Sequence, residues 1–371
     1  MSLSKLVSIS NRYGRDEEYI LAGGGNTSYK EGGVMYVKGS GAALADIRPE
    51  QFVRMDMHAL SDMLGKKYPL QDAQREAMAL NDMMAARLEG EEHKRPSVEA
   101  VLHALFPQKF VVHTHPALVN GMSCAKNGER ACRDIFEDTV LWIPLTKPGY
   151  ILAKVCRDLF SQYEKSVGKL PGVVILQNHG MFVAADTIDE IIAQTDEVIC
   201  KLKGQITRFP GFADVSCGKG APDVIATRLS ALYGKDARVV LCRDAQVVEF
   251  LADEQFIKEL IAPFTPDHIV YCKHTPLVLE QDSHIEEKFG GYLSAHGFAP
   301  KIVIVMGVGF FALGSNQKEA ETARALFIDA MKIVVYARAF GGTSPLPDDF
   351  TYFILNWEAE MYRQKTSLVA E

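Results

Sequence analysis

Short apolar runs alternate with amphipathic segments along the whole chain, and turns rich in glycine or proline separate them. The runs have the length and β-branched content typical of buried strands, whereas the amphipathic segments repeat apolar side chains at helical spacing. Because strands and helices interleave, the pattern predicts an α/β fold. In the first half we expect strands at residues 34–41, 109–116 and 141–145, a strand pair at residues 172–185, and helices at residues 5–21, 71–89, 95–106, 151–165 and 187–203.

A segment rich in Gly, Pro and Ser, residues 209–222, interrupts this pattern and is the best candidate for a linker. We therefore expect a first domain at residues 1–208 and a second at residues 223–371, which agrees with about two domains for a chain of 371 residues. In the second domain we expect strands at residues 237–242, 246–251, 268–272 and 301–306, and a long helix at residues 316–339.

The two halves share a faint repeat. Residues 171–190 align without gaps on residues 300–319, and both segments predict a strand, a glycine turn, a second strand and a long helix. By the same logic, residues 110–116 align with residues 268–276. The pattern fits a duplicated domain, and a chance similarity of two α/β segments is the alternative.

Composition narrows the class of protein. The formal net charge of -7 and the absence of a basic tract disfavour a nucleic-acid partner. Seven cysteines without a Cys-x-x-Cys pair disfavour a disulfide framework and a thiolate zinc site. The first residues lack the apolar core of a signal peptide, and no run is long enough to span a membrane. We expect a protein of a reducing compartment, the cytoplasm, with no membrane partner.

Three histidines carry the strongest chemical signal. Side chains two residues apart on a strand project from the same face, so His113 and His115 point into one space. A second apolar strand ends in a tight turn that holds His179. Three imidazoles with an open fourth position are typical of a catalytic zinc site. The alternative is that some of these histidines are buried and structural.

Glu99 begins a helix that leads into the strand of His113. A carboxylate at this place can reach a metal and act as a general acid or base. Ser97, at the same helix start, offers a hydroxyl and free backbone N–H groups that suit an anion. The alternative assigns Ser97 and Glu99 to helix capping and to the helix dipole.

Two glycine-containing turns, residues 23–28 and 38–41, add further polar groups that suit an anion. Glycine lets backbone N–H groups approach a ligand, and Asn26, Thr27, Ser28 and Ser40 add side-chain donors. Neither turn is a dinucleotide or a Walker motif. Together with Ser97, they predict a phosphate pocket, whereas each alone reads as an ordinary turn.

These motifs resemble the class II aldolase/adducin family. The segments GGGNTS, VKGSG, PSVEAVLHALFP, VVHTHP and LQNHGMFVA occur in the order and approximate spacing of that family. Later segments, among them FTPDHIVYCKHTPLVL and NWEAEMYR, resemble the aldolase portion of bifunctional rhamnulose-1-phosphate aldolase/lactaldehyde dehydrogenases. The resemblance implies a three-layer α/β/α fold for residues 1–208 and a degenerate second copy, with a structural or oligomerisation role, for residues 223–371.

The resemblance also implies roles for single residues. His113, His115 and His179 fall on the zinc ligands, and Glu99 falls on the acid/base glutamate. The positions resembling the phosphate cradle are Gly25, Asn26, Thr27, Ser40, Gly41 and Ser97. Two positions depart from the family: Val98 replaces a second phosphate-binding serine, and Leu145 replaces a frequent tyrosine, with Tyr150 five residues on.

The implied activity is retro-aldol cleavage of a ketose phosphate of the rhamnulose- or fuculose-1-phosphate type, with Zn²⁺ or another divalent metal as cofactor. The resemblance leaves open a pentulose-phosphate epimerase, a methylthioribulose-phosphate dehydratase and a non-catalytic, adducin-like interaction module. The implied partners are a small sugar phosphate and copies of the same chain, in a homo-oligomeric tetramer or dimer.

Overall fold

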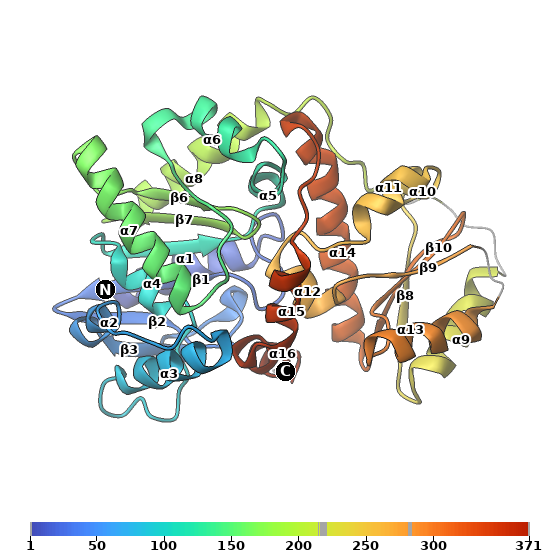
Figure 1. The fold of residues 1–371 in the computed structure, drawn as a ribbon, viewed down its shortest axis with the longest axis horizontal. Helices are drawn as coiled ribbons and strands as arrows, with labels where there is room; N and C mark the ends of the chain where they lie inside the picture. The colour runs from blue at the N-terminus through green and yellow to red at the C-terminus, as the bar shows by residue number, and fades with distance from the viewer. Residues whose placement is uncertain (1, 214, 216–220, 281–283, 370–371) are drawn as a thin grey trace. The chain divides into compact units, whose positions relative to one another are not determined.

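The computed structural model describes residues 2–213, 215, 221–280 and 284–369, and Figure 1 labels its helices and strands. Contacts divide the chain into two compact units. Unit 1 contains Met1–Ser123, Asn127–Gln205 and Trp357–Glu371, and unit 2 contains Cys124–Lys126 and Ile206–Asn356. Part of the expected linker at residues 209–222, namely residues 214 and 216–220, lies outside the described residues.

Unit 1 is built on one sheet of seven strands in the order β3-β2-β1-β4-β7-β6-β5. Neighbouring strands are antiparallel except for β5 and β6, which are parallel. The strands are β1 Asn26–Glu31, β2 Val34–Lys38, β3 Phe52–Asp56, β4 Phe110–Thr114, β5 Leu141–Ile143, β6 Val173–Leu176 and β7 Gly180–Ala185.

Helices cover both faces of this sheet. The first hydrophobic core joins α2 (Met57–Met63), α3 (Asp72–Ala85), α4 (Ala100–Leu105) and α7 (Tyr150–Val167) to apolar side chains of one face. On the other side, α1 and α8 pack on β1, β4 and β7. The remaining helices of unit 1 are α1 Ser2–Gly14, α5 Ala117–Ser123, α6 Gly128–Phe136, α8 Ile188–Lys203 and α16 Glu358–Val369. The expected three-layer α/β/α fold is thereby confirmed.

Unit 2 has a sheet of four strands in the order β8-β11-β10-β9. Its strands are β8 Arg238–Cys242, β9 Leu277–Leu279, β10 Ile302–Val305 and β11 Gly309–Gly314. Its helices are α9 Ala221–Tyr233, α10 Ala245–Leu251, α11 Glu254–Leu260, α12 Pro266–Cys272, α13 Ile285–His296, α14 Gln317–Ala337 and α15 Asp348–Asn356. A second hydrophobic core lies between this sheet and the helices α9 and α13.

Three expectations for the second half were wrong. Residues 246–251 and 268–272 form the helices α10 and α12 instead of strands. The strand that pairs with β11, as β4 pairs with β7, is β8 at residues 238–242, and the expected alignment of residues 110–116 with residues 268–276 does not hold. Finally, Trp357–Glu371 clusters with unit 1 rather than with the second half, because Glu358 and Tyr362 contact Arg95.

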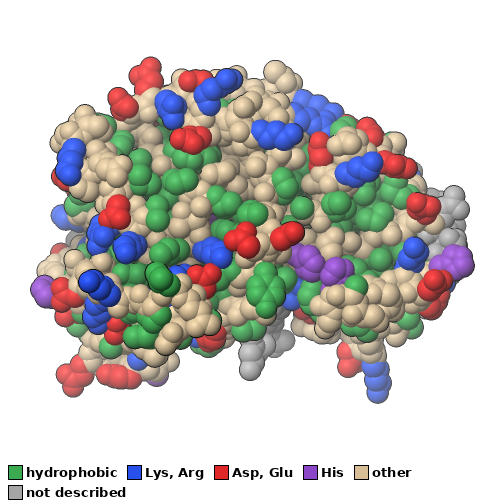
Figure 2. All heavy atoms as spheres, viewed as in Figure 1, with side chains coloured by type: hydrophobic (Ala, Val, Ile, Leu, Met, Phe, Trp, Pro, Cys, Tyr) green, Lys and Arg blue, Asp and Glu red, His purple; other side chains and the backbone are tan. Residues whose placement is uncertain are grey.

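Two features of the described residues bear on the class of protein. Among them, six cysteines are free thiols and no helix is long and apolar enough to cross a membrane. Figure 2 shows acidic and basic side chains interspersed over the visible face, in keeping with the modest net charge.

Candidate metal centre

Two neighbouring elements of the unit 1 sheet bring the three histidines together. His113 lies on β4, His115 follows the end of that strand, and His179 lies in the turn between β6 and β7. β4 pairs directly with β7, so the turn before β7 lies next to the C-terminal end of β4. A Cβ atom on Gly180 would lie 2.4 Å from the Thr114 carbonyl and 2.7 Å from His115 Cδ2. Only glycine at this position lets the turn approach the histidine strand so closely.

The imidazoles converge as expected. One ring nitrogen from each of His113, His115 and His179 lies within 4.8 Å of the others. The Nε2 atoms of His113 and His115 are 2.9 Å apart. His113 is fully buried, whereas the other two rings are partly accessible. The rings of His115 and His179 are therefore the part of the cluster that solvent reaches.

The hydrogen bonding of His113 prepares its outer nitrogen for a cation. His113 Nδ1 lies 2.9 Å from the Met181 carbonyl, which can only accept a hydrogen bond. The proton therefore sits on Nδ1, and Nε2 presents its lone pair to the cluster. The ring also stacks on Phe182, with centroids 4.0 Å apart and planes at 11°. Backbone and packing thus fix both the tautomer and the orientation of the ring.

Glu99 lies beside the cluster, at the residue that caps α4. Its Oε2 is 3.4 Å from His113 Nε2, and its Oε1 is 3.6 Å from His179 Nε2. Among the described residues, Oε1 has no hydrogen-bond partner although it is buried. A buried carboxylate oxygen without a partner is costly unless a cation or a ligand proton meets it.

A chain of buried hydrogen bonds orients this carboxylate. Asn26 Nδ2 donates to Glu99 Oε2 at 2.6 Å, and Asn26 Oδ1 accepts from His103 Nε2. Ser28 Oγ lies 2.7 Å from His103 Nδ1 and is its donor in this arrangement. Burial holds the pKa of His103 well below its usual value, so the ring is neutral and can link two neighbours in this way.

The donor set fits a divalent cation. Three imidazoles plus a nearby carboxylate are a ligand set for zinc and other late divalent metals. The group of potential ligands found among the described residues contains no cysteine. The carbonyl behind His113 is the outer-shell partner that metal-binding histidines usually have. A cation among these groups would also give a charged partner to Glu99 Oε1, which has no hydrogen bond among the described residues.

The residues of the expected phosphate cradle lie partly together. Pro96 forms an isolated β-bridge with Gly39, and Ser97 N donates to the Lys38 carbonyl at 2.9 Å. This bridge brings the segment of Ser97 alongside the turn that holds Ser40 and Gly41. Gly25 immediately precedes Asn26 at the start of β1, and its carbonyl accepts from Lys38 Nζ at 2.8 Å.

Two residues of the expected phosphate cradle, Asn26 and Thr27, form hydrogen bonds with other residues of unit 1. Thr27 points to the opposite face of β1 from Asn26, where its hydroxyl lies 2.7 Å from Ser10 Oγ of α1. The amide of Asn26 is engaged at both ends by Glu99 and His103. Asn26 therefore positions Glu99 in this structure, and Thr27 anchors the sheet to α1.

Lys38 is a buried charged residue near the candidate site that the sequence motifs did not single out. Its ammonium group is buried and donates to the carbonyls of Gly23 and Gly25. It thereby fixes the glycine turn that presents Asn26. A lysine at the end of an apolar strand, directly before a glycine turn, is the signal that could have found it.

Tyr150 and Leu145 do not extend the cluster. The Tyr150 hydroxyl donates to the Lys66 carbonyl at 3.1 Å, and its ring packs against Tyr68. The Leu145 backbone N–H donates to Gln177 Oε1 at 2.9 Å. The tyrosine of this segment therefore supports the start of α7.

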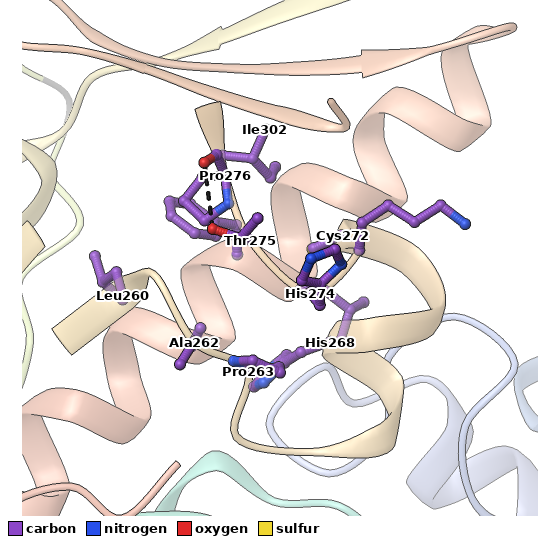
Figure 3. Close-up of a pocket in the computed structure, with 13 residues that line it drawn as sticks. Leu260, Ala262, Pro263, His268, Cys272, His274, Thr275, Pro276 and Ile302 are labelled. Atoms are coloured by element: carbon purple, nitrogen blue, oxygen red, sulfur yellow. Dashed lines mark hydrogen bonds between the residues drawn. The ribbon is translucent and has the colours of Figure 1, made fainter. Parts of the chain in front are cut away.

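A second group of histidines lies around a small cavity in unit 2 (Figure 3). His268 Nε2 lies 3.1 Å from Asp329 Oδ2, and Cys272 and His274 line the same space. Burial raises the pKa of the Cys272 thiol, which keeps it protonated. The cavity volume of about 20 Å³ is enough for one water and far too small for a sugar phosphate.

Comparison with known proteins points to one family. The sequence model of the class II aldolase and adducin N-terminal domain matches residues 4–202, which is more than half of the chain. A curated relative from Bacillus subtilis (strain 168), named uncharacterized oxidoreductase YuxG, is 24% identical over 409 residues. The match covers 97% of this chain but 58% of the relative, so the chain spans less than two thirds of that protein's length.

Two of the solved structures that match this chain show partial similarity to it. The N-terminal class II aldolase domain of a conserved protein from Thermoplasma acidophilum is 25% identical, covers 55% of this chain and 93% of its own, and has a TM-score of 0.46. An L-fuculose-1-phosphate aldolase from Thermus thermophilus is 16% identical, covers 53% of this chain and 92% of its own, and has a TM-score of 0.33.

Proposed function

This chain belongs to the class II aldolase and adducin family, and we propose that it cleaves a phosphorylated ketose by a metal-dependent retro-aldol reaction. The observation that carries the proposal is the cluster of His113, His115 and His179 with Glu99 beside it. Three converging imidazoles and an oriented carboxylate supply the two groups that this reaction needs, a Lewis acid site and a proton carrier.

The bond to be broken joins C3 and C4 of the ketose. As it breaks, the C4 hydroxyl gives its proton to water and becomes an aldehyde, and the electron pair of the C3–C4 bond moves toward the C2 carbonyl. A divalent cation held by the three histidines would supply the electrostatic stabilisation of the charge that develops there. The second product, dihydroxyacetone phosphate, then requires a proton at C3.

We assign Glu99 as the residue that donates this proton to C3. Its Oε2 is held by Asn26, whereas its Oε1 has no hydrogen-bond partner among the described residues. A carboxyl group with one fixed and one available oxygen can hold a proton at a defined point and release it there. The chain of hydrogen bonds from Ser28 through His103 to Asn26 keeps the Glu99 carboxylate from rotating away from the cluster.

The phosphate of the substrate would bind at the turns of Gly25, Ser40, Gly41 and Ser97. Backbone N–H groups and hydroxyls of this kind recognise phosphate oxygens and orient the rest of the ligand. We further propose zinc as the metal, a homo-oligomer as the assembly and the cytoplasm as the compartment, as in the resembled family.

A panel of ketose phosphates tests the proposal. Rhamnulose, fuculose, ribulose and methylthioribulose phosphates are incubated with the full chain, with and without a chelator, while dihydroxyacetone phosphate and aldehyde are measured. We expect release of both products from a ketose 1-phosphate, loss of release with the chelator and recovery on adding Zn²⁺. Epimerised or dehydrated products would favour the related activities, and no metal binding would favour a non-catalytic module.

A further inference from the structure

The C-terminal helix α16 engages one arginine of unit 1. Arg95 Nη1 and Nη2 donate to Glu358 Oε1 and Oε2 at 2.9 and 2.6 Å, which is a two-pronged ion pair. The ring of Tyr362, one helical turn later, lies under the same guanidinium at 4.2 Å. Glu358 and Tyr362 therefore hold Arg95 between a carboxylate and an aromatic face.

The same face of α16 continues to the expected phosphate turn. Thr366 lies four residues after Tyr362, about 6 Å further along the helix axis. A Cβ atom on Gly41 would lie 2.3 Å from Thr366 Oγ1, so the helix packs directly on the glycine backbone. The guanidinium of Arg95 and the turn at Gly41 thus lie about one helical turn apart on one surface.

The backbone ties Arg95 to that turn. Ser40 N donates to the Arg95 carbonyl at 2.7 Å, and Ser97, another expected phosphate ligand, is two residues away. Among the described residues, Arg95 Nε is buried without a hydrogen-bond partner, so the ion pair with Glu358 leaves part of the guanidinium unsatisfied.

We propose that Arg95 is an additional ligand for the phosphate of the substrate and that Glu358 competes with this phosphate for the guanidinium. The inference rests on the proposed function, since it takes the substrate to be a sugar phosphate. It adds two features to that function. The Arg95 guanidinium supplies a positive charge for the phosphate dianion, and the helix α16 releases Arg95 when the substrate binds.

The exchange is physically reasonable because the two anions bind a guanidinium in the same way. Both a carboxylate and a phosphate accept two parallel N–H donors, and a phosphate dianion carries more charge. The Arg95 guanidinium lowers the pKa of Glu358, so the competitor is ionised at neutral pH. The Glu358 side chain is 59% exposed, and a partly exposed ion pair contributes little net stability and can be displaced.

The test uses inorganic phosphate titrated calorimetrically into the full-length protein. Glu358→Gln removes the competing charge and is expected to bind phosphate about fivefold more tightly. Arg95→Gln is expected to bind about tenfold more weakly, and Arg95→Lys, which keeps the charge but loses the fork, is expected to lie between Arg95→Gln and the wild type. Glu286→Gln is the matched control, because Glu286 forms a similar two-pronged pair with Arg228 in unit 2 and is 55% exposed. We expect no change in this control.

A kinetic comparison separates this proposal from the proposed function. With a cleaved ketose phosphate, Glu358→Gln should lower KM, and Arg95→Gln should raise it with a smaller effect on kcat. Wild-type phosphate affinity in Arg95→Gln, or equal weakening in Arg95→Gln and Glu358→Gln, would overturn the role of Arg95. Absence of any cleavage by the wild type would instead reject the retro-aldol activity and leave the phosphate titration interpretable.

Discussion

The hairpin β6–β7 of unit 1 and the hairpin β10–β11 of unit 2 have the same backbone and different chemistry. In both, the first strand pairs in parallel with a short neighbour, β5 or β9, and the second pairs antiparallel with a longer one, β4 or β8. Asn178 and Gly307 occupy the same left-handed position in the turn, with φ of 56° and 74°. Thr187 and Asn316 cap the helices that follow.

The difference lies in the side chains at the ends of the strands. The strand register places Leu241 opposite Phe311, as His113 lies opposite Phe182. Arg243 and Val308 then stand where unit 1 has His115 and His179, and the Arg243 guanidinium donates to the Gly307 and Val308 carbonyls. Within its described residues, unit 2 also lacks counterparts of β1–β3; β1 carries Asn26, and the turn after β2 carries Ser40. The two hairpins share strand pairing and turn conformation, and the three-histidine cluster is found in unit 1 among the described residues.

The largest effect is expected from His179→Val, which gives unit 1 the side chain that unit 2 has at Val308. Loss of a metal ligand should lower metal affinity by more than about 100-fold, since loss of an outer-shell partner alone costs about 10- to 100-fold. Metal content after dialysis and retro-aldol turnover should fall together. The control Val308→Ala should leave metal content and turnover unchanged. Metal retention by His179→Val would contradict the assignment of His179 as a metal ligand.

Glu99→Gln should affect turnover without affecting the metal. The amide keeps the shape of the side chain but cannot carry the proton at C3, so kcat should fall by about 10²- to 10⁴-fold. Metal analysis and cleavage rates on the same preparation separate the two effects. Turnover equal to that of the wild type would exclude Glu99 as the proton carrier.

A smaller effect is expected from His103→Phe, which breaks the relay from Ser28 to Asn26 and Glu99. The carboxylate loses its orientation, and kcat should fall by about 10- to 100-fold with little change in KM. His103→Gln, which can still donate to Asn26, should restore part of the rate. The matched change His268→Phe removes a buried histidine of unit 2 that pairs with Asp329 and should lower stability alone. A purely structural His103 would show the same pattern as His268.

The smallest effect concerns a buried lysine. Burial lowers the pKa of Lys30 to about 7, against the opposing effect of the Asp186 carboxylate. In the unfolded chain the pKa is about 10.4, so between these values the unfolded state binds more protons and stability rises with pH. From pH 7 to pH 9, the wild type should gain about 2 kcal/mol relative to Lys30→Met in urea unfolding. Parallel curves of stability against pH for the wild type and Lys30→Met would contradict the lowered pKa of Lys30.

Sequence patterns predicted the hairpins of both units, because strictly apolar runs around a glycine turn have few alternatives. They failed for α10 and α12, whose short Val- and Ile-rich runs favour strands by propensity. Local capping decided these cases: Asp244 accepts from Val247 N, and Thr265 precedes Pro266 and accepts from His268 N. These capping residues were visible in the sequence.

Other features of the site depend on contacts between distant residues and had no local signal. The histidines could be recognised because His113 lies on an apolar strand, His115 directly follows it, and His179 follows another strand of the same sheet. The contact of Glu358 with Arg95 joins residues far apart in the sequence of unit 1, and the link from His103 to Asn26 crosses from α4 to β1. Such pairs appear only when the tertiary structure is known.

The metal-to-chain ratio of the wild-type protein tests the central claim most directly. The full-length protein is loaded with Zn²⁺, dialysed and analysed by mass spectrometry of the metal together with the protein concentration. One metal ion per chain, lost on replacement of His113 by alanine, is the predicted result, because unit 1 has the three imidazoles and unit 2 has Leu241, Arg243 and Val308. No retained metal, or an ion that persists without His113, would contradict it.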